Sequence, residues 1–252
     1  MSLLFAISDL RNELNAFGKL ASEMLAPGAD AVLRTASGQL DGIAKRSSDA
    51  PPVRWSISRE SPLYTQPSYG AYMPDDKGGL IVYGEITFIW ELQPIRPKGD
   101  TRVAQHVLLN GIASTAIRLL YGEPWDPEEA QELAMWRMEI ADHKAPGTFF
   151  HVQVLGREED KVFPKELDIP RLPGVLNSPF ACMEFVLSEL FQERWIRIAQ
   201  QDSAQCRQWR AIQAHRHRRH LDWAAEKIEN ASGSPWVAWK AAKPYREIFL
   251  SD

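Results

Sequence analysis

The chain of 252 residues has only two cysteines, Cys182 and Cys206, and no CxxC pair. Two cysteines cannot build the disulfide framework of a small secreted domain, and the chain has no cysteine–histidine quartet for a structural zinc ion. We therefore expect a reducing compartment and assign the protein to the cytoplasm. The chain also has no run of about 18 apolar residues, and acidic residues interrupt its apolar N-terminus, unlike a secretory signal. These absences predict a soluble protein with no membrane contact.

The short motifs that identify nucleotide and hydrolase sites are missing as well. The sequence has no GxxxxGK loop, no GxGxxG loop, no GxSxG elbow and no HExxH pair. The net charge of −4 excludes a general polyanion binder, so nucleic acid would have to bind at a local basic patch. We predict no cofactor and no metal ion, and the function must be argued from less specific patterns.

The composition is that of an ordinary globular protein, with 44% hydrophobic and 25% charged residues. The length suits one large domain, or a domain with an appended segment, and is sufficient for a sizeable core. Nine tryptophans are many for this length. Because large aromatic side chains fill cores and interfaces alike, their number also suggests a partner.

Hydrophobic periodicity predicts helices first and then strands. Apolar residues three and four positions apart predict one helix over 3–25 and a second over 30–44. The period then changes to two in Val53–Glu60, which indicates a half-buried strand. A long, tyrosine-rich loop follows at Ser61–Gly79, and Gly79–Ile95 is β-branched and aromatic on both faces, which is typical of a central strand.

The second half of the chain predicts more strands and then helices again. The stretch after Thr101 is ambiguous, and we expect a helix up to Asn110 followed by a strand over Ser114–Tyr121. Alternating residues in Leu133–Asp142 and Phe149–Gly156 predict a hairpin. Ser178 and Pro179 then open a helix in the preferred order of N-cap and first-turn proline, and this helix runs to about Ile198.

These elements predict an α+β fold with N-terminal helices, a central antiparallel meander of about four to six strands, and C-terminal helices packed on one face. We divide the chain into an α+β domain, residues 1–202, and a C-terminal segment, residues 203–252. The segment contains a basic helix, Ala204–Asn230, and an aromatic tail with the sequence SPWVAWKAAKPYREIFLSD. We expect this segment to dock on the same domain or on a partner.

The first candidate site is the polar face of the sheet. In a meander, one face gathers the side chains of Glu85, Arg118, Arg137, Glu139, His151 and Gln153. Carboxylates and an imidazole can move protons or hold a metal, so the enzyme alternative is a metal-dependent phosphodiesterase or nuclease with Glu85, Glu139 and His151 as catalytic residues. The simpler interpretation is a solvated face with cross-strand charge pairs.

Other possible metal sites have weaker support. His143 and His151 flank one hairpin turn, and His217 and His220 share a helix face, but neither pair has a full ligand set. Arginines around the second pair would repel a divalent cation. The acids and lysines of Arg157–Asp168 resemble a nuclease arrangement, although they follow a strand in what reads as a turn and such spacing is common by chance.

The second candidate site is the C-terminal basic helix. Its proposed binding residues, to which we add Arg137 of the sheet, are Arg207, Trp209, Arg210, Arg216, Arg218, Arg219 and Trp223. Arginine pairs with phosphates and carboxylates, and tryptophan anchors interfaces or stacks on bases. The simpler interpretation is a solvated helix face.

We predict a non-enzymatic binding or assembly module that acts through this region on a protein partner, on a second copy of itself or on nucleic acid. Assembly predicts helix aromatics buried against protein, whereas nucleic-acid binding predicts a continuous exposed basic stripe. A second alternative is a small-molecule sensor with the loop Ser61–Gly79 as a lid over an apolar cavity.

Overall fold

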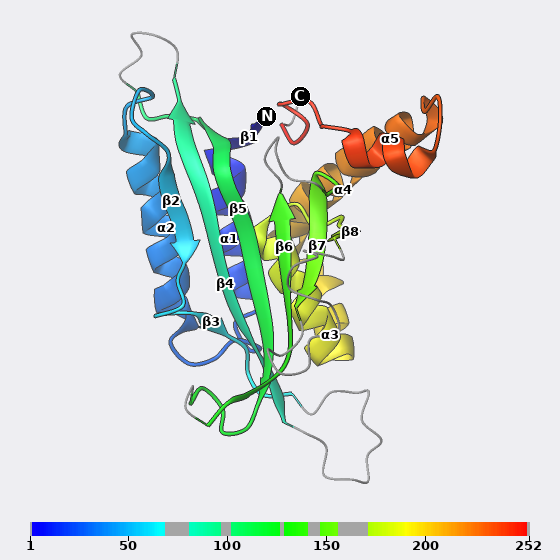
Figure 1. Ribbon diagram of the computed structural model, residues 1–252. Coiled ribbons are helices and arrows are strands. Elements are labelled where there is room, and N and C mark those ends of the chain that lie inside the picture. Colours follow the sequence, from blue (N-terminus) through cyan, green and yellow to red (C-terminus); the bar gives the residue numbers. More distant parts are fainter. Residues whose placement is uncertain are drawn as a thin grey trace.

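A computed structural model of the chain describes residues 2–68, 81–96, 102–126, 129–140, 147–155 and 171–250 (Figure 1). The strands are β1 (Leu3–Ala6), β2 (Val53–Ile57), β3 (Leu63–Tyr64), β4 (Val82–Ile95), β5 (His106–Tyr121), β6 (Gln131–Ile140), β7 (Phe150–Leu155) and β8 (Arg171–Pro173). The helices are α1 (Ile7–Leu20), α2 (Ala29–Lys45), α3 (Pro179–Ala199), α4 (Ala204–Glu229) and α5 (Pro235–Ala241).

The eight strands form one antiparallel sheet. Its main order is β2-β4-β5-β6-β7-β8, while β1 pairs with the start of β5 and β3 pairs with β4. From β4 to β8 each strand lies beside the next one in the chain, which is a meander. The predicted α+β class, with its antiparallel meander and its C-terminal helices, is confirmed. Helices α1 to α4 lie behind the sheet in the view of Figure 1, so one face of the sheet is covered.

Two of the predicted boundaries are wrong. Residues 3–25 do not form one helix, because residues 3–6 pair with β5 and the helix begins only at Ile7. A short apolar run fits either period, and the free edge of β5 decides for the strand. The expected helix before Asn110 is instead part of β5, whose alternation is broken by a bulge. Gly111 has a φ of 130° there, a backbone conformation that glycine adopts without strain.

The core lies between the sheet and the helices. Trp55 of β2 packs edge-on against Phe88 of β4, with ring centroids 4.8 Å apart, and contacts Phe180 of α3. The indole Nε1 of Trp55 donates a hydrogen bond to the carbonyl oxygen of Ala36 in α2 at 3.0 Å. The aromatic residues therefore join β2, β4, α2 and α3 into one core.

The C-terminal segment packs on the N-terminal helix and then leaves the body. Helix α4 lies against α1, and α5 extends away from the sheet at the far end of α4 (Figure 1). The chain then returns, because the backbone N–H of Leu4 donates to the carbonyl oxygen of Arg246 at 2.9 Å and Phe249 packs on Phe5. Within the described ranges, no helix is both long and apolar enough to cross a lipid bilayer.

Candidate functional site

One polar cluster lies at the end of the sheet where β4 begins. The antiparallel register places Glu85 of β4 opposite Arg118 of β5. The guanidinium of Arg118 contacts Glu85 Oε1 at 2.8 Å and Glu132 Oε2 at 2.7 Å, and Tyr64 donates its hydroxyl to Glu85 Oε2 at 3.1 Å. Burial, together with the charge of Glu85, raises the pKa of Tyr64 to about 12. Glu85 therefore has partners on both oxygens and acts as a structural acceptor.

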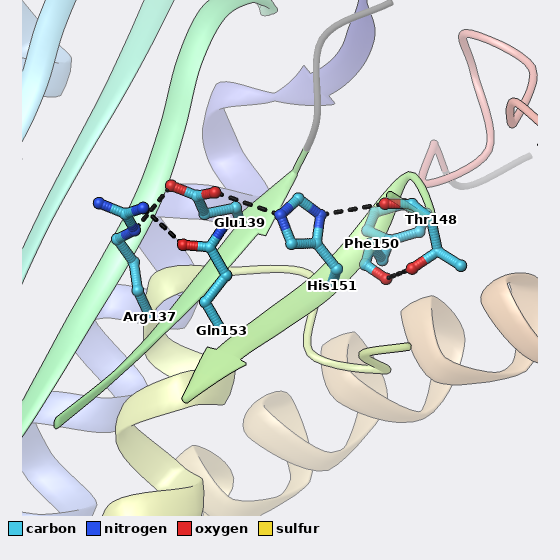
Figure 2. Close-up of polar contacts among 6 residues, drawn as sticks. All are labelled: Arg137, Glu139, Thr148, Phe150, His151 and Gln153. Carbon is cyan, nitrogen blue, oxygen red and sulfur yellow. Dashed lines mark hydrogen bonds and ion pairs between the residues drawn. The ribbon is translucent and has the colours of Figure 1, made fainter. Parts of the chain in front are cut away.

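A second polar cluster lies on the hairpin of β6 and β7 (Figure 2). The register places Arg137 opposite Gln153 and Glu139 opposite His151. Arg137 Nε lies 2.8 Å from Glu139 Oε1, and Arg137 Nη2 donates to Gln153 Oε1 at 2.5 Å. The predicted face therefore brings these four residues together, and two of them, His151 and Gln153, are buried.

The contacts of His151 decide what this cluster can do. Nδ1 lies 3.0 Å from the carbonyl oxygen of Thr148, and Nε2 lies 3.2 Å from Glu139 Oε2 (Figure 2). Both contacts are made within the chain, so each ring nitrogen of His151 already faces an oxygen of a neighbouring residue. The geometry suits a fixed cross-strand network better than a general base.

The two clusters do not converge. Glu85 lies opposite Arg118, whereas Glu139 lies opposite Ser114, four residues further along β5. At about 3.3 Å per residue this separates the two carboxylates by about 13 Å along the strand. Across the described ranges, no group of three or more His, Cys, Asp or Glu side chains could hold a metal ion. His143 and the acidic stretch 157–168 lie outside the described residues.

Three of the predicted binding residues on α4 are buried in the chain's own core. Trp209 and Trp223 are 2% exposed, and Arg216 is 1% exposed. Arg216 Nη1 contacts Glu13 Oε2 on α1 at 2.6 Å, and Glu13 Oε1 accepts hydrogen bonds from Ser178 and Gln213. These side chains join α4 to α1 and α3, and they present no surface to a partner.

Sequence reasoning missed Glu13, although a signal was present. Glu13 lies three positions after Leu10 and four before Phe17, within the apolar stripe of α1. A carboxylate on such a stripe needs a buried partner. The sequence does not show which cation is that partner, because Arg216 lies 203 residues further along the chain.

The remaining arginines of α4 do not form one continuous basic surface. Arg207 and Arg210 are exposed and lie 2.9 Å and 3.8 Å from Asp202. Arg219 lies over the ring of Tyr245, 5.9 Å from its centroid, and Arg218 is exposed. The predicted basic patch is therefore divided by buried Arg216 and by local partners.

The histidines of α4 belong to the packing of the helix. His220 is 1% exposed and lies between Phe150 and Trp223, with the ring of Phe150 at 4.4 Å. Burial lowers the pKa of His220 to about 4, with a smaller effect of His217, and burial also lowers the pKa of His217. A neutral, enclosed imidazole acts here as a core aromatic residue.

The most exposed aromatic surface of the C-terminal segment lies after α4. We call residues 230–245 the arm; it contains α5, none of whose residues is buried. Trp236 is 48% exposed, Val237 62% and Tyr245 43%. The sequence predicts an aromatic tail, but the tryptophans predicted to bind a partner are those of α4. The sequence alone does not separate buried from exposed tryptophans, because burial depends on which neighbours the fold supplies.

Two features bear on the remaining alternatives. A small hollow of about 220 Å³ lies between α1 and α4 and is lined by Lys19, amide side chains and alanine, which is less than most ligand pockets enclose. Residues 69–80 of the tyrosine-rich loop lie outside the described residues. Burial raises the pKa of the Cys182 thiol, so this cysteine is a packing residue and not a nucleophile.

No family model, no curated protein and no solved structure matches this chain.

Proposed function

We propose that this protein is a non-enzymatic binding or assembly module that contacts a protein partner through the arm. The observation that carries the proposal is the exposure of Trp236 and Val237 on a helix that has no buried residue. Tryptophan is the side chain most enriched among interface residues that dominate binding energy, and grouped apolar exposure marks interaction sites.

The way the arm is held supports this proposal. Before the arm, Trp223 of α4 is buried, and after it Ile248 and Phe249 are buried against the body. Both ends of the exposed segment are therefore fixed, and the tryptophans do not lie on a frayed terminus. A surface held in place loses less conformational entropy when it binds.

A protein partner is better supported than nucleic acid. Phosphate recognition needs several accessible cations along one path. On α4 the path is interrupted, because Arg216 is buried against Glu13 and Arg219 lies against Tyr245. The exposed groups of the arm are aromatic and aliphatic, as at the centre of protein interfaces.

The enzyme alternative has less support. In each polar cluster of the sheet, the carboxylate is held by an arginine and a second side chain. Glu85 and Glu139 are also separated along the sheet, so they do not act on one substrate atom. This pairing supports a structural role of the two clusters in the sheet over a catalytic one.

Site-specific photo-crosslinking in the native host tests the proposal. A photoreactive benzophenone amino acid replaces Val237 in the arm or, as the control, Ile112 of β5, which is exposed to a similar degree. We expect a discrete protein adduct from position 237 and none of the same mass from position 112. As a positive control, the same folded variant is irradiated with an added peptide at high concentration, to which it should crosslink. If that control works and position 237 still forms no adduct in the host, the proposal is contradicted.

A further inference from the structure

A second apolar surface lies on the helix-covered face of the sheet, beside α3. Val154 of β7 lies opposite Trp136 in the register, and Leu172 of β8 lies opposite Val152. Phe185 of α3 packs edge-on against Trp136, with ring centroids 6.1 Å apart. Val154, Leu172 and Phe185 are 45%, 48% and 37% exposed. We call Trp136, Val154, Leu172 and Phe185 the edge patch.

The edge patch and the arm have opposite charge. Of the glutamates in α3, Glu189 and Glu193 are exposed, whereas Glu184 is engaged with Trp195 and Trp209; Arg194 and Arg197 follow only near the end of the helix. Glu189 is exposed one turn from Phe185, on the same helix face. The arm, in contrast, has Lys240 and Lys243 and no acidic residue. An aromatic, basic segment and an apolar, acidic surface are therefore complementary in both respects.

The same asymmetry extends over the whole chain. Residues 204–252 have nine Lys and Arg against five Asp and Glu, whereas residues 1–203 have twenty against twenty-eight. Several arginines of α4 are buried or paired within the chain, so the part of this excess that bears on a second copy is the arm. The positive charge of the arm orients the encounter of two copies and adds to the apolar contact.

We propose that the occupant of the edge patch is a second copy of this chain, whose arm covers Val154, Leu172 and Phe185. The inference rests on the proposed function of the arm and names its partner. Within one molecule α5 packs on α4, and its exposed Trp236 remains available for a contact between molecules. When each copy inserts its arm into the other, the contact is made twice and the dimer is closed.

The reciprocal arrangement also accounts for the modest size of each surface. Each exposed aromatic side chain contributes part of the 150–250 Å² that a fully buried one removes from water. One arm on one patch is therefore smaller than a standard interface of about 1,600 Å², and making the contact twice doubles the area that is buried. The proposal thus predicts a reversible dimer whose dissociation is measurable.

Sedimentation velocity over a concentration series of the full chain tests the proposal. The arm variant is Trp236→Ser/Val237→Ser, the patch variant is Leu172→Ser, and the control is Ile112→Ser. We expect the wild type and the control to dimerise with the same dissociation constant. Because buried aromatic and aliphatic anchors dominate interfaces, each of the other variants should raise that constant by at least about tenfold.

Mixing the two defective variants tests whether arm and patch meet in different molecules. The arm variant retains an intact patch and the patch variant an intact arm, so the mixture can form one of the two contacts. We expect heterodimers that bind more tightly than either variant binds itself. Exchanging the charges is an independent experiment. Lys240→Glu/Lys243→Glu in one copy should weaken the dimer, and Glu189→Lys in the partner copy should restore it.

The outcomes separate this inference from the proposed function. If the wild-type chain stays monomeric at all concentrations while position 237 crosslinks to another protein, the inference of a second copy is wrong. The proposed function as a binding module then still holds. A dimer that the arm variant does not weaken overturns the inference as well. If the chain neither dimerises nor crosslinks through position 237, both proposals are wrong.

Discussion

Arg216 of α4 and Glu13 of α1 form an ion pair that is almost completely removed from solvent. Arg216 Nη1 lies 2.6 Å from Glu13 Oε2, with side chains 2% and 0% exposed. Arg216 also lies over the ring of Phe5, 5.6 Å from its centroid. A buried pair of this kind stabilises little beyond an apolar replacement, but neither partner can be removed alone without a large cost.

We predict that Arg216→Ala lowers the free energy of unfolding by about 3–5 kcal/mol, because it leaves the carboxylate of Glu13 buried without its cation. Denaturant unfolding measures this loss. Arg194→Ala is the matched control, since Arg194 pairs with Glu23 at 2.9 Å in an exposed position, and it should cost less than about 1 kcal/mol. Equal losses in the two variants would show that the pair with Glu13 is not special.

His220 predicts acid sensitivity of the fold. Its pKa falls from 6.5 to about 4 on burial, so between these values the unfolded chain binds the proton and the folded one does not. The free energy of unfolding is therefore not reduced by His220 above pH 6.5, and it decreases as the pH falls toward 4. The total decrease is on the order of 3 kcal/mol.

Thermal or denaturant unfolding between pH 4 and 7 checks this sign. His220→Phe keeps a ring beside Phe150 and Trp223 and removes the titration. The difference in stability between wild type and variant should therefore change with pH over this interval. A constant difference would mean that His220 titrates alike in the folded and unfolded chains.

The sheet could be predicted because its strands repeat with a period of two. The alternation in β2 and in the hairpin of β6 and β7 was sufficient to place Arg137, Glu139, His151 and Gln153 on one face. In β5 the bulge at Gly111 interrupts the alternation, and the sequence predicts a helix for the part of the strand up to Asn110. Such a strand is held by hydrogen bonds to neighbouring strands, and local periodicity does not show which strands pair.

The location of exposed aromatic residues could not be predicted, because burial is a property of the tertiary contacts. Trp209 and Trp223 are buried, whereas Trp236 is half exposed, although all three lie in helices close together in sequence. The same holds for arginine: Arg216 has a buried partner on α1, and Arg218 is exposed. Composition identified the right segment, and packing decided which of its residues face outward.

The hairpin cluster predicts a local loss of stability. Glu139 contacts both Arg137 and His151, so Glu139→Ala removes both contacts and leaves His151 Nε2 without its partner. We expect a loss of about 1–3 kcal/mol in the free energy of unfolding. Glu23→Ala, which removes an exposed contact to Arg194, is the control and should cost less than about 1 kcal/mol. Similar losses would show that the Glu139 contacts are solvated and weak.

Binding of nucleic acid should be weak, since few cations of α4 are accessible along one path. Binding to the nucleic-acid backbone grows with the number of phosphates that cations neutralise, and each such contact adds to the salt dependence. On α4, Arg207 and Arg210 lie beside Asp202, and Arg218 is the next exposed arginine. We predict no retention of labelled single- or double-stranded DNA or RNA at about 150 mM salt, measured by fluorescence anisotropy over a salt series.

The matched variants make this prediction decisive. One replaces Arg207, Arg210 and Arg218 by alanine, and the control replaces three exposed arginines of the body, Arg34, Arg54 and Arg59. Because both variants lose the same net charge, a nonspecific electrostatic effect weakens low-salt binding equally in both. Salt-sensitive binding that only the α4 variant loses would show that α4 contacts phosphates, and it would replace a protein partner by nucleic acid as the ligand of the C-terminal segment.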